Sequence, residues 1–267
     1  MYDTGASFQH ARLKPMRALY ETLVPAEWRF WFYKVRHWED VDGMRSHVHP
    51  SPKGNFSLRG FDQRRAIFVH IPKAAGTSVA LSLFGELPYH YTAGHYRVIF
   101  GRRTYRRYFK FAFVRNPWDR LYSAYHYLRA GGWNDADKAW AEANLARFTS
   151  FDQFVLEWLT RERLASYMHF HTQASFLCDW RGRPIIDHLG YFETLEEDFR
   201  LIAARLGVDA ALGHVNRSDR EDYRAAYSSA TMERVAEVYR EDIEAFGYDF
   251  DGIQQRKRVL NGAFVPA

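Results

Sequence analysis

The fold of this chain is decided by Ile71-Pro72-Lys73-Ala74-Ala75-Gly76-Thr77-Ser78, a short loop between a β-prone segment and a helical pattern. Residues 66–69 are apolar enough for a buried parallel strand, and apolar residues recur at helical spacing over 79–84. Backbone N–H groups around Gly76 would then point at an anion across a helix N-terminus, and Lys73 adds a positive charge. The stretch therefore predicts a cradle for a pyrophosphate-like group of a nucleotide.

The loop differs from the ordinary P-loop, in which the lysine follows the second glycine. Here Lys73 precedes Gly76, and no glycine occupies the first position. The alternative is that Pro72 and Gly76 simply make a tight turn, with Thr77 capping the helix.

A second segment has the same strand-to-helix character. Residues 109–114 indicate another buried strand, and Asn116 and Pro117 are favourable N-cap and first helical residues. Arg115 at the strand end and Ser123 in the second turn of the helix could together clamp one phosphate. A salt bridge for Arg115 and a solvated hydroxyl for Ser123 are the alternatives.

These two segments together resemble the sulfotransferases that use 3′-phosphoadenosine 5′-phosphosulfate (PAPS), specifically the carbohydrate sulfotransferase branch, similar to sulfotransferase family 2. The P-K-x-x-G-T-[ST] loop of that family is matched by Lys73, Gly76, Thr77 and Ser78, and its R-[DN]-P-x-x-R-x-x-S segment by Arg115, Asn116, Pro117, Arg120 and Ser123. Weaker similarity continues at 169–173, 191–195, 214–218 and 239–248. Relatives tend to have tryptophan and proline in place of Phe170 and Thr172.

The resemblance implies an α/β fold in which a P-loop-like central parallel β-sheet is flanked by helices. We expect a single sulfotransferase domain over 61–250, a helical N-terminal extension over 1–60 and a C-terminal tail over 251–267. The sequence further predicts a helical stretch over about 150–170 and a strand within 185–192. A helix should begin near 195 with Thr194 and Glu197 as a capping box, and the last helix should end at Gly247.

The resemblance also assigns roles. The 5′-phosphosulfate of PAPS would be held by Lys73, Ala74, Ala75, Gly76, Thr77 and Ser78, the 3′-phosphate by Arg115 and Ser123, and a loop over the nucleotide would be closed by Arg217 and Ser218. Lys73 would also be catalytic, because it neutralises the leaving phosphate of the product PAP. His95, in a Gly-His pair between the two motifs, would be the general base, and imidazole accepts a proton near neutral pH. Glu86 is the alternative base.

The expected reaction is in-line transfer of a sulfuryl group from PAPS to a hydroxyl, most simply on a saccharide or glycolipid. A lipid headgroup or a small alcohol presents the same chemistry. A P-loop kinase or NTPase would need an acidic magnesium ligand near the loop, whereas the neighbouring strand ends in Arg115. A non-catalytic PAP-binding protein is the remaining alternative.

Composition limits the remaining possibilities. The excess of basic residues, 37 against 32 acidic, does not indicate a nucleic-acid partner, and one cysteine permits no internal disulfide. The histidines lack zinc-ligand spacing, so no metal is expected. The absence of a long apolar run predicts a cytoplasmic protein.

Two surface features remain open. The aromatic and basic segment 26–38 could pack internally, form a homodimer or contact the inner membrane face peripherally. A cluster of arginines, Arg102, Arg103, Arg106 and Arg107, could line a groove for an acidic acceptor or be a solvated basic face.

Overall fold

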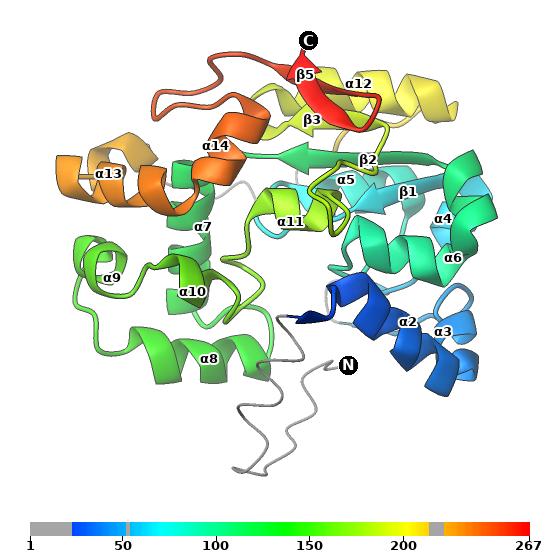
Figure 1. Ribbon diagram of the computed structural model, residues 1–267, viewed down its shortest axis with the longest axis horizontal. Coiled ribbons are helices and arrows are strands. Elements are labelled where there is room, and N and C mark those ends of the chain that lie inside the picture. The colour runs from blue at the N-terminus through cyan, green and yellow to red at the C-terminus, as the bar shows by residue number, and fades with distance from the viewer. Residues whose placement is uncertain (1–22, 52–53, 214–221) are drawn as a thin grey trace.

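The centre of the molecule is a three-stranded parallel sheet. The computed structural model describes residues 23–51, 54–213 and 222–267. Strands β1 (Ala66–Val69), β2 (Phe109–Val114) and β3 (His188–Tyr191) are hydrogen-bonded in the order β1-β2-β3. β2 is buried along nearly its whole length and all three strands run parallel, as expected for strands covered on both faces. The predicted α/β fold with a helix-flanked parallel sheet is confirmed (Figure 1).

Helices connect and cover these strands. Before β1 come α2 (Ala26–Arg36), α3 (Trp38–Gly43) and α4 (Arg59–Arg64); between β1 and β2, α5 (Gly76–Phe84) and α6 (Ala93–Arg107); between β2 and β3, α7 (Pro117–Arg129), α8 (Asp135–Leu145), α9 (Phe151–Glu157), α10 (Arg161–Leu164) and α11 (Gln173–Leu177). After β3 come η1 (Phe192–Thr194), α12 (Leu195–Leu206), η2 (Tyr223–Ala226), α13 (Ser229–Val238), α14 (Arg240–Phe246) and the antiparallel pair β4 (Lys257–Leu260) and β5 (Ala263–Pro266).

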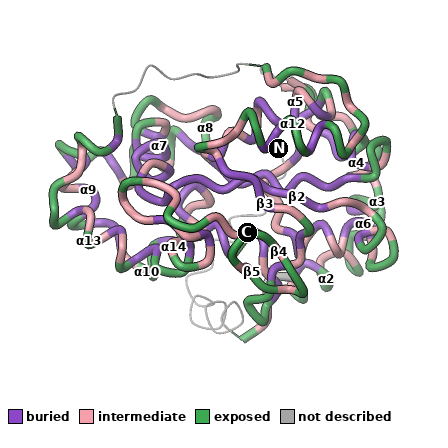
Figure 2. Tube along the Cα trace, turned by 90° about the horizontal axis from the view of Figure 1, so that it is seen from above, coloured by how far each residue is buried: buried purple, intermediate pink, exposed green. Residues whose placement is uncertain are grey.

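Two hydrophobic clusters make the core. One surrounds the sheet and takes in β1, β2 and the buried faces of α5 and α6. The other lies among α7, α8, α9 and α13, where Phe154 and Tyr239 are fully buried. Figure 2 shows the buried strands through the middle of the molecule and exposed chain around its rim. α7 leads directly from β2 into the second cluster, so the carboxyl ends of the strands lie beside the junction of the two clusters.

Local sequence signals fix most helix boundaries. Asn116 accepts a hydrogen bond from the N–H of Trp118 and Pro117 is the first residue of α7, as predicted. Gly247 ends α14 in the left-handed conformation. The Thr194–Glu197 capping box is wrong, because Thr194 donates instead to the buried carboxylate of Asp198 at 2.8 Å. That carboxylate also accepts the N–H of Tyr191, so it fastens the end of β3 to α12.

The aromatic N-terminal segment is partly packed and partly exposed. Phe30 is buried against α6, and Lys34 Nζ donates to the carbonyl of Val98 at 3.1 Å. By contrast, Trp28 and Trp31 are more than half exposed. Internal packing therefore accounts for one face of α2 only. Among the described residues, no helix combines the length and the apolar character needed to cross a bilayer.

The arginine cluster lies at the amino ends of the strands. α6 bends at Gly101, whose φ is 75°, and then carries Arg102, Arg103, Arg106 and Arg107 exposed up to the start of β2. The sequence motifs follow the carboxyl ends of β1 and β2, so the length of a strand separates them from these arginines. This placement favours the solvated basic face over an acceptor groove.

Candidate functional site

The loop after β1 has an unusual backbone. Lys73 and Ala75 adopt positive φ angles of 70° and 60°, a conformation that costs non-glycine residues about 1–3 kcal/mol each and that clusters at functional sites. Ala75 is the N-cap of α5, and because alanine has no side-chain acceptor, the first N–H groups of α5 receive no N-cap bond. A helix of nine residues with uncapped N–H groups beside a lysine is suited to an anion.

Gly76 is required by close packing beneath this loop. A Cβ atom at residue 76 would lie 1.7 Å from Cδ2 and 2.0 Å from Nε2 of His70, which is buried at the end of β1. The His70 ring thus occupies the space that any other side chain at residue 76 would need. The tight turn expected at Gly76 is present, and a glycine is needed there because the imidazole of His70 lies directly beneath the loop.

Lys73 lies against an aromatic and acidic group that the sequence did not reveal. Its Nζ is 3.9 Å from the centroid of the Tyr127 ring, a cation–π contact. The Tyr127 hydroxyl donates to Asp137 Oδ2 at 2.7 Å, and the N–H of Trp133 donates to the same oxygen at 2.8 Å. His169 Nε2 is 3.4 Å from Asp137 Oδ1. Burial alone would raise the pKa of Asp137, but nearby His169 and the hydrogen bonds from Tyr127 and Trp133 hold it below its usual value, so Asp137 is an anion behind the Tyr127 ring that Lys73 contacts.

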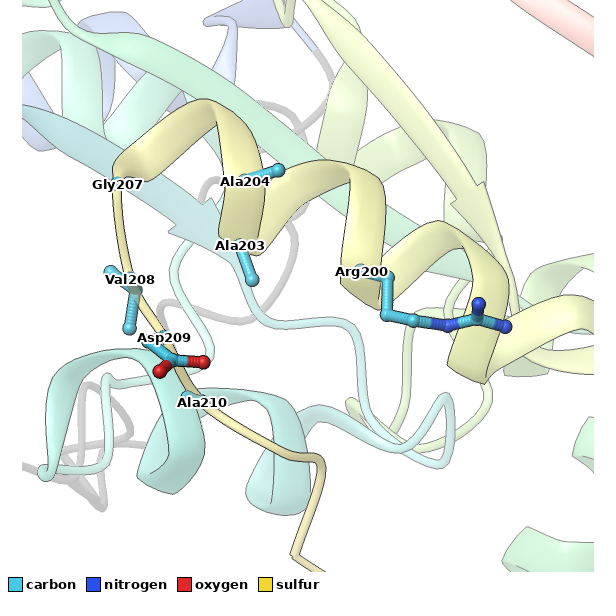
Figure 3. Close-up of a pocket in the computed structure, with 7 residues that line it drawn as sticks. All are labelled: Arg200, Ala203, Ala204, Gly207, Val208, Asp209 and Ala210. Carbon is cyan, nitrogen blue, oxygen red and sulfur yellow. The ribbon is translucent and has the colours of Figure 1, made fainter.

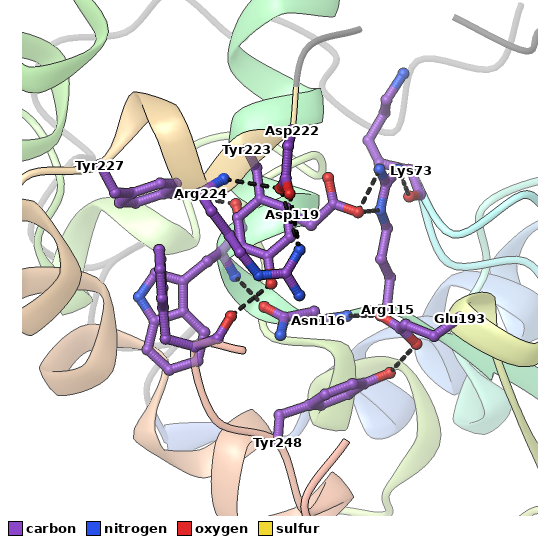
Figure 4. A network of polar contacts seen from close by, with 12 residues as sticks. Lys73, Arg115, Asn116, Asp119, Glu193, Asp222, Tyr223, Arg224, Tyr227 and Tyr248 are labelled. Carbon is purple, nitrogen blue, oxygen red and sulfur yellow. Dashed lines mark hydrogen bonds and ion pairs between the residues drawn. The ribbon is translucent and has the colours of Figure 1, made fainter. Parts of the chain in front are cut away.

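Arg115 joins the two sequence motifs physically. Its Nη1 donates to the carbonyl of Lys73 at 3.1 Å, and its Nε donates to Asp119 Oδ2 at 2.7 Å (Figure 4). The guanidinium lies 4.0 Å from the centroid of the Phe192 ring. The salt bridge that the sequence offered as the alternative role of Arg115 is therefore present. It holds the guanidinium between the loop of residues 71–78, called the phosphate loop below, and the first turn of α7.

The backbone that carries Arg115 is fastened by polar side chains from distant segments. Gln173 accepts the N–H of Arg115 at 2.9 Å and donates to its carbonyl at 2.8 Å, while Glu193 accepts the N–H of Asn116 at 2.7 Å. Asp242 in turn accepts the N–H of Gln173 at 2.8 Å. The segments 169–173, 191–195 and 239–248 thus converge on the end of β2.

The other residues of the second motif are also buried. Arg120 donates from Nε to the carbonyl of Pro72 at 3.0 Å and from Nη1 to that of His171 at 2.9 Å, so it ties α7 to the phosphate loop. Ser123 is buried on α7, three residues further along, and is 6% exposed. Ser78 is likewise buried in the first turn of α5.

The predicted bases lie in different surroundings. His95 is in the first turn of α6, where its Nδ1 accepts the N–H of Thr92 at 3.4 Å and its ring centroid is 4.6 Å from that of Phe30. Glu86 lies beyond the C-terminal end of α5, paired with Arg59. Since α5 begins at the loop and is about 13 Å long, Glu86 lies at the far end of the helix from Lys73. Arg217 and Ser218 lie outside the described residues.

Some residues of the site could not be found from local patterns. Tyr127 and Asp137 resemble ordinary helical surface residues in the sequence, because only the folding of α7 and α8 brings them to Lys73. Gln173 and Glu193 carried a signal, since both belong to segments that share the family resemblance. Their task of bonding the Arg115 and Asn116 backbone became visible only in the structure.

A separate pocket of about 410 Å³ is not part of this site. Residues 200–210, at the C-terminal end of α12 and in the loop that follows it, line this pocket (Figure 3). α12 leads away from the carboxyl end of β3, and Arg205 in its last turn lies 4.3 Å from the ring centroid of Phe109 at the start of β2, so the pocket is near the amino ends of the strands. Throughout the described part of the chain, no group of three or more His, Cys, Asp or Glu side chains is arranged to hold a metal ion.

Comparisons with known proteins identify the family to which this chain belongs. A curated protein of Archaeoglobus fulgidus, described as an uncharacterized protein, is 29% identical over 125 residues, which are 46% of this chain and 89% of that protein. The crystal structure of mouse sulfotransferase SULT7A1 complexed with PAP aligns with a TM-score of 0.43 and 13% identity, covering 74% of this chain and 95% of that one. The model of the sulfotransferase family matches residues 96–249, which include Arg115 and Ser123 and exceed half of the chain. The protein therefore belongs to the sulfotransferase family.

Proposed function

We propose that this protein transfers the sulfuryl group of PAPS to a hydroxyl of a saccharide or glycoconjugate. One observation carries the assignment of the site. Arg115 at the end of β2 donates to the carbonyl of Lys73 in the loop after β1. Because β1 and β2 are neighbouring parallel strands, two basic residues suited to bind anions lie side by side at their carboxyl ends. A nucleotide with phosphates at both its 5′ and 3′ positions matches two such neighbouring sites.

The 5′ side is assigned to the loop. Lys73 would contact the leaving phosphate, and the backbone N–H groups of residues 74–76 with the hydroxyls of Thr77 and Ser78 would surround it. Arg115 and Ser123 would hold the 3′-phosphate. Arg115 already has Asp119 as a partner, which keeps the guanidinium in place before the phosphate arrives. Arg217 and Ser218 keep their sequence-based role as a prediction.

The reaction exchanges one sulfur–oxygen bond for another. The acceptor oxygen attacks sulfur as the bond from sulfur to the 5′-phosphate oxygen breaks, and the electron pair of that bond leaves with PAP. Negative charge therefore grows on the phosphate next to Lys73. The hydroxyl proton passes to a base on the protein. The protein thus supplies the positive charge next to the leaving phosphate and holds PAPS and the acceptor in position for the transfer.

A transfer assay tests the proposal. Labelled PAPS is incubated with the protein and with separate carbohydrate, lipid and small-molecule fractions of the source cell, in EDTA. We expect label in the carbohydrate fraction and a severe loss of rate for Lys73→Ala with the fold retained. Label only in the lipid or the small-molecule fraction would replace the saccharide assignment. In a parallel assay with ATP and magnesium in place of PAPS and EDTA, magnesium-dependent ATP hydrolysis by a protein that transfers no sulfate would contradict the function itself.

Peripheral membrane contact through α2 is a separate expectation, which rests on exposed aromatics beside cations. The double variant Trp28→Ser with Trp31→Ser tests it better than truncation of the N-terminus, because truncation would also remove the buried Phe30. With vesicles that contain anionic lipid, the wild type should float and the variant should not. Equal flotation of both proteins would show that Trp28 and Trp31 do not mediate membrane contact, contrary to this expectation. The cytoplasmic location and a homodimer stay predictions from the sequence.

A further inference from the structure

His70, His90 and His169 lie near the phosphate loop, and His95 is the base predicted from the sequence. The contacts of these four side chains show which of them has a ring nitrogen available to accept a proton. His169 is buried beside Asp137, and His70 is packed under Gly76. His95 caps the start of α6. His90, in the segment between α5 and α6, is the remaining one and reaches the surface in part.

The tautomer of His90 follows from its partner. Its Nδ1 is 2.8 Å from the carbonyl oxygen of His70. A carbonyl oxygen can only accept, so Nδ1 carries the proton of the neutral ring and Nε2 keeps its lone pair. Among the described residues Nε2 has no hydrogen-bond partner, and it is not one of the enclosed atoms. His90 thus presents an unprotonated nitrogen that no protein group uses.

The bond also fixes where this ring lies. His70 immediately follows β1, and the ring centroids of His70 and His90 are 4.2 Å apart. The His70 ring is also packed against Gly76. His90 is therefore one ring away from the phosphate loop. Burial lowers the pKa of His90 to about 4, and smaller opposing effects on it come from the charges of Asp137, which raises it, and Lys73, which lowers it.

His95 has the opposite arrangement. Its Nδ1 accepts the N–H of Thr92, so a neutral His95 carries its proton on Nε2 and has no free lone pair. Its ring lies between Phe30 and Tyr91, at centroid distances of 4.6 and 5.8 Å. Burial lowers the pKa of His95 to about 4, and the charge of Arg29 in α2 lowers it further.

The geometry points to His90 as the catalytic base that takes the acceptor proton, and to His95 as a residue that caps α6. This assignment rests on the sulfuryl transfer proposed above. As the acceptor oxygen bonds to sulfur, its proton moves to Nε2 of His90, and the pair of the broken sulfur–oxygen bond leaves with PAP. The resulting imidazolium keeps its Nδ1–H bond to the His70 carbonyl.

Two matched substitutions test the assignment. His90→Asn keeps a donor for the His70 carbonyl and removes Nε2, whereas His95→Asn keeps an acceptor for Thr92 and removes Nε2 there. His47→Asn, at an exposed histidine, is the control. The probe is labelled PAPS with the carbohydrate extract of the source cell, and PAP affinity is measured by calorimetry for every variant.

We expect His90→Asn to lower turnover by about 10²–10⁴-fold with PAP affinity within about twofold, while His95→Asn stays within about threefold of the wild type. Near-normal turnover of His90→Asn, or a large loss confined to His95→Asn, would overturn the assignment. A second readout needs no acceptor: ¹⁵N NMR of the full chain should show the Nδ1–H tautomer for His90 and the Nε2–H tautomer for His95. The reverse tautomers would refute the geometry even if no transfer occurred, whereas absent transfer with the expected tautomers would count against the proposed function alone.

Discussion

At the scale of single residues, the phosphate loop depends on the absence of one side chain. The space above the Gly76 Cα atom is filled by the ring of His70, and this ring is held in the core at the end of β1. Lys73 and Ala75, on either side of Ala74, already take strained positive φ angles. The loop therefore has little freedom to move away from a new atom.

Gly76→Ala should displace either the loop or the His70 ring. We expect PAP affinity to fall at least about tenfold and the free energy of unfolding to fall by about 1–3 kcal/mol, as for other overpacked sites. Calorimetry and urea unfolding measure the two effects. The double variant Gly76→Ala with His70→Ala removes the clashing ring and should regain part of the lost affinity. If Gly76→Ala alone binds PAP normally, this packing argument is wrong.

Asp242 provides a pH-dependent test of the scaffold behind Arg115. Burial raises the pKa of its fully enclosed carboxyl from 3.8 to about 6. A raised carboxyl pKa means that the folded state binds the proton more tightly than the unfolded state. The stability that this provides is present at low pH and is lost as pH rises from about 4 through 6.

We compare the wild type with Asp242→Asn, which cannot ionise at this position. The free energy of unfolding of the wild type, relative to that of the variant, should fall by up to about 3 kcal/mol between pH 4 and pH 7 and then stay constant. Urea unfolding of both proteins across this range measures the difference. A difference that does not change with pH would show that Asp242 titrates normally.

At the scale of secondary-structure elements, the end of β2 is held from both sides by side chains. The amide of Gln173 pairs with both backbone groups of Arg115, and it is fully buried. Gln173→Ala would leave two buried backbone groups unpaired, at about 1–3 kcal/mol each. Reduced stability and weaker PAP binding should appear together, the first by thermal unfolding and the second by calorimetry. Gln63→Ala, at an exposed glutamine of α4, is the matched control and should change neither.

Elements with strong local signals were predicted well. β1, α5, β2 and the start of α7 follow from apolar runs, a glycine and an Asn-Pro cap, all of which act within a few residues. The Thr194 cap failed because the hydroxyl of Thr194 donates to Asp198, four residues further along, and accepts no backbone N–H of α12. Lys73–Tyr127, Gln173–Arg115 and Asp242–Gln173 join residues dozens of positions apart, and no local pattern encodes such pairs. The sequence thus indicated the phosphate motifs but could not show what holds them.

At the scale of the whole molecule, the proposed nucleotide site joins the two hydrophobic clusters. The phosphate loop is part of the sheet cluster, whereas Ser123 is on α7, which packs in the helical cluster. A ligand that contacts both motifs connects both clusters, so its binding energy should stabilise the molecule as a unit. At a free concentration of 100 times Kd, such a ligand adds about 2.7 kcal/mol to the free energy of unfolding.

PAP and AMP differ by the 3′-phosphate, so they test whether both motifs are engaged. At equal concentration PAP should raise the unfolding temperature clearly and AMP much less, because only PAP reaches Arg115 and Ser123. Ser123→Ala removes one hydroxyl without touching the Arg115 bond to the loop. We therefore expect PAP affinity to fall by about 0.5–1.5 kcal/mol or more, with AMP affinity unchanged. Differential scanning calorimetry with each nucleotide measures this, and equal stabilisation by PAP and AMP in the wild type would contradict a 3′-phosphate site at the end of β2.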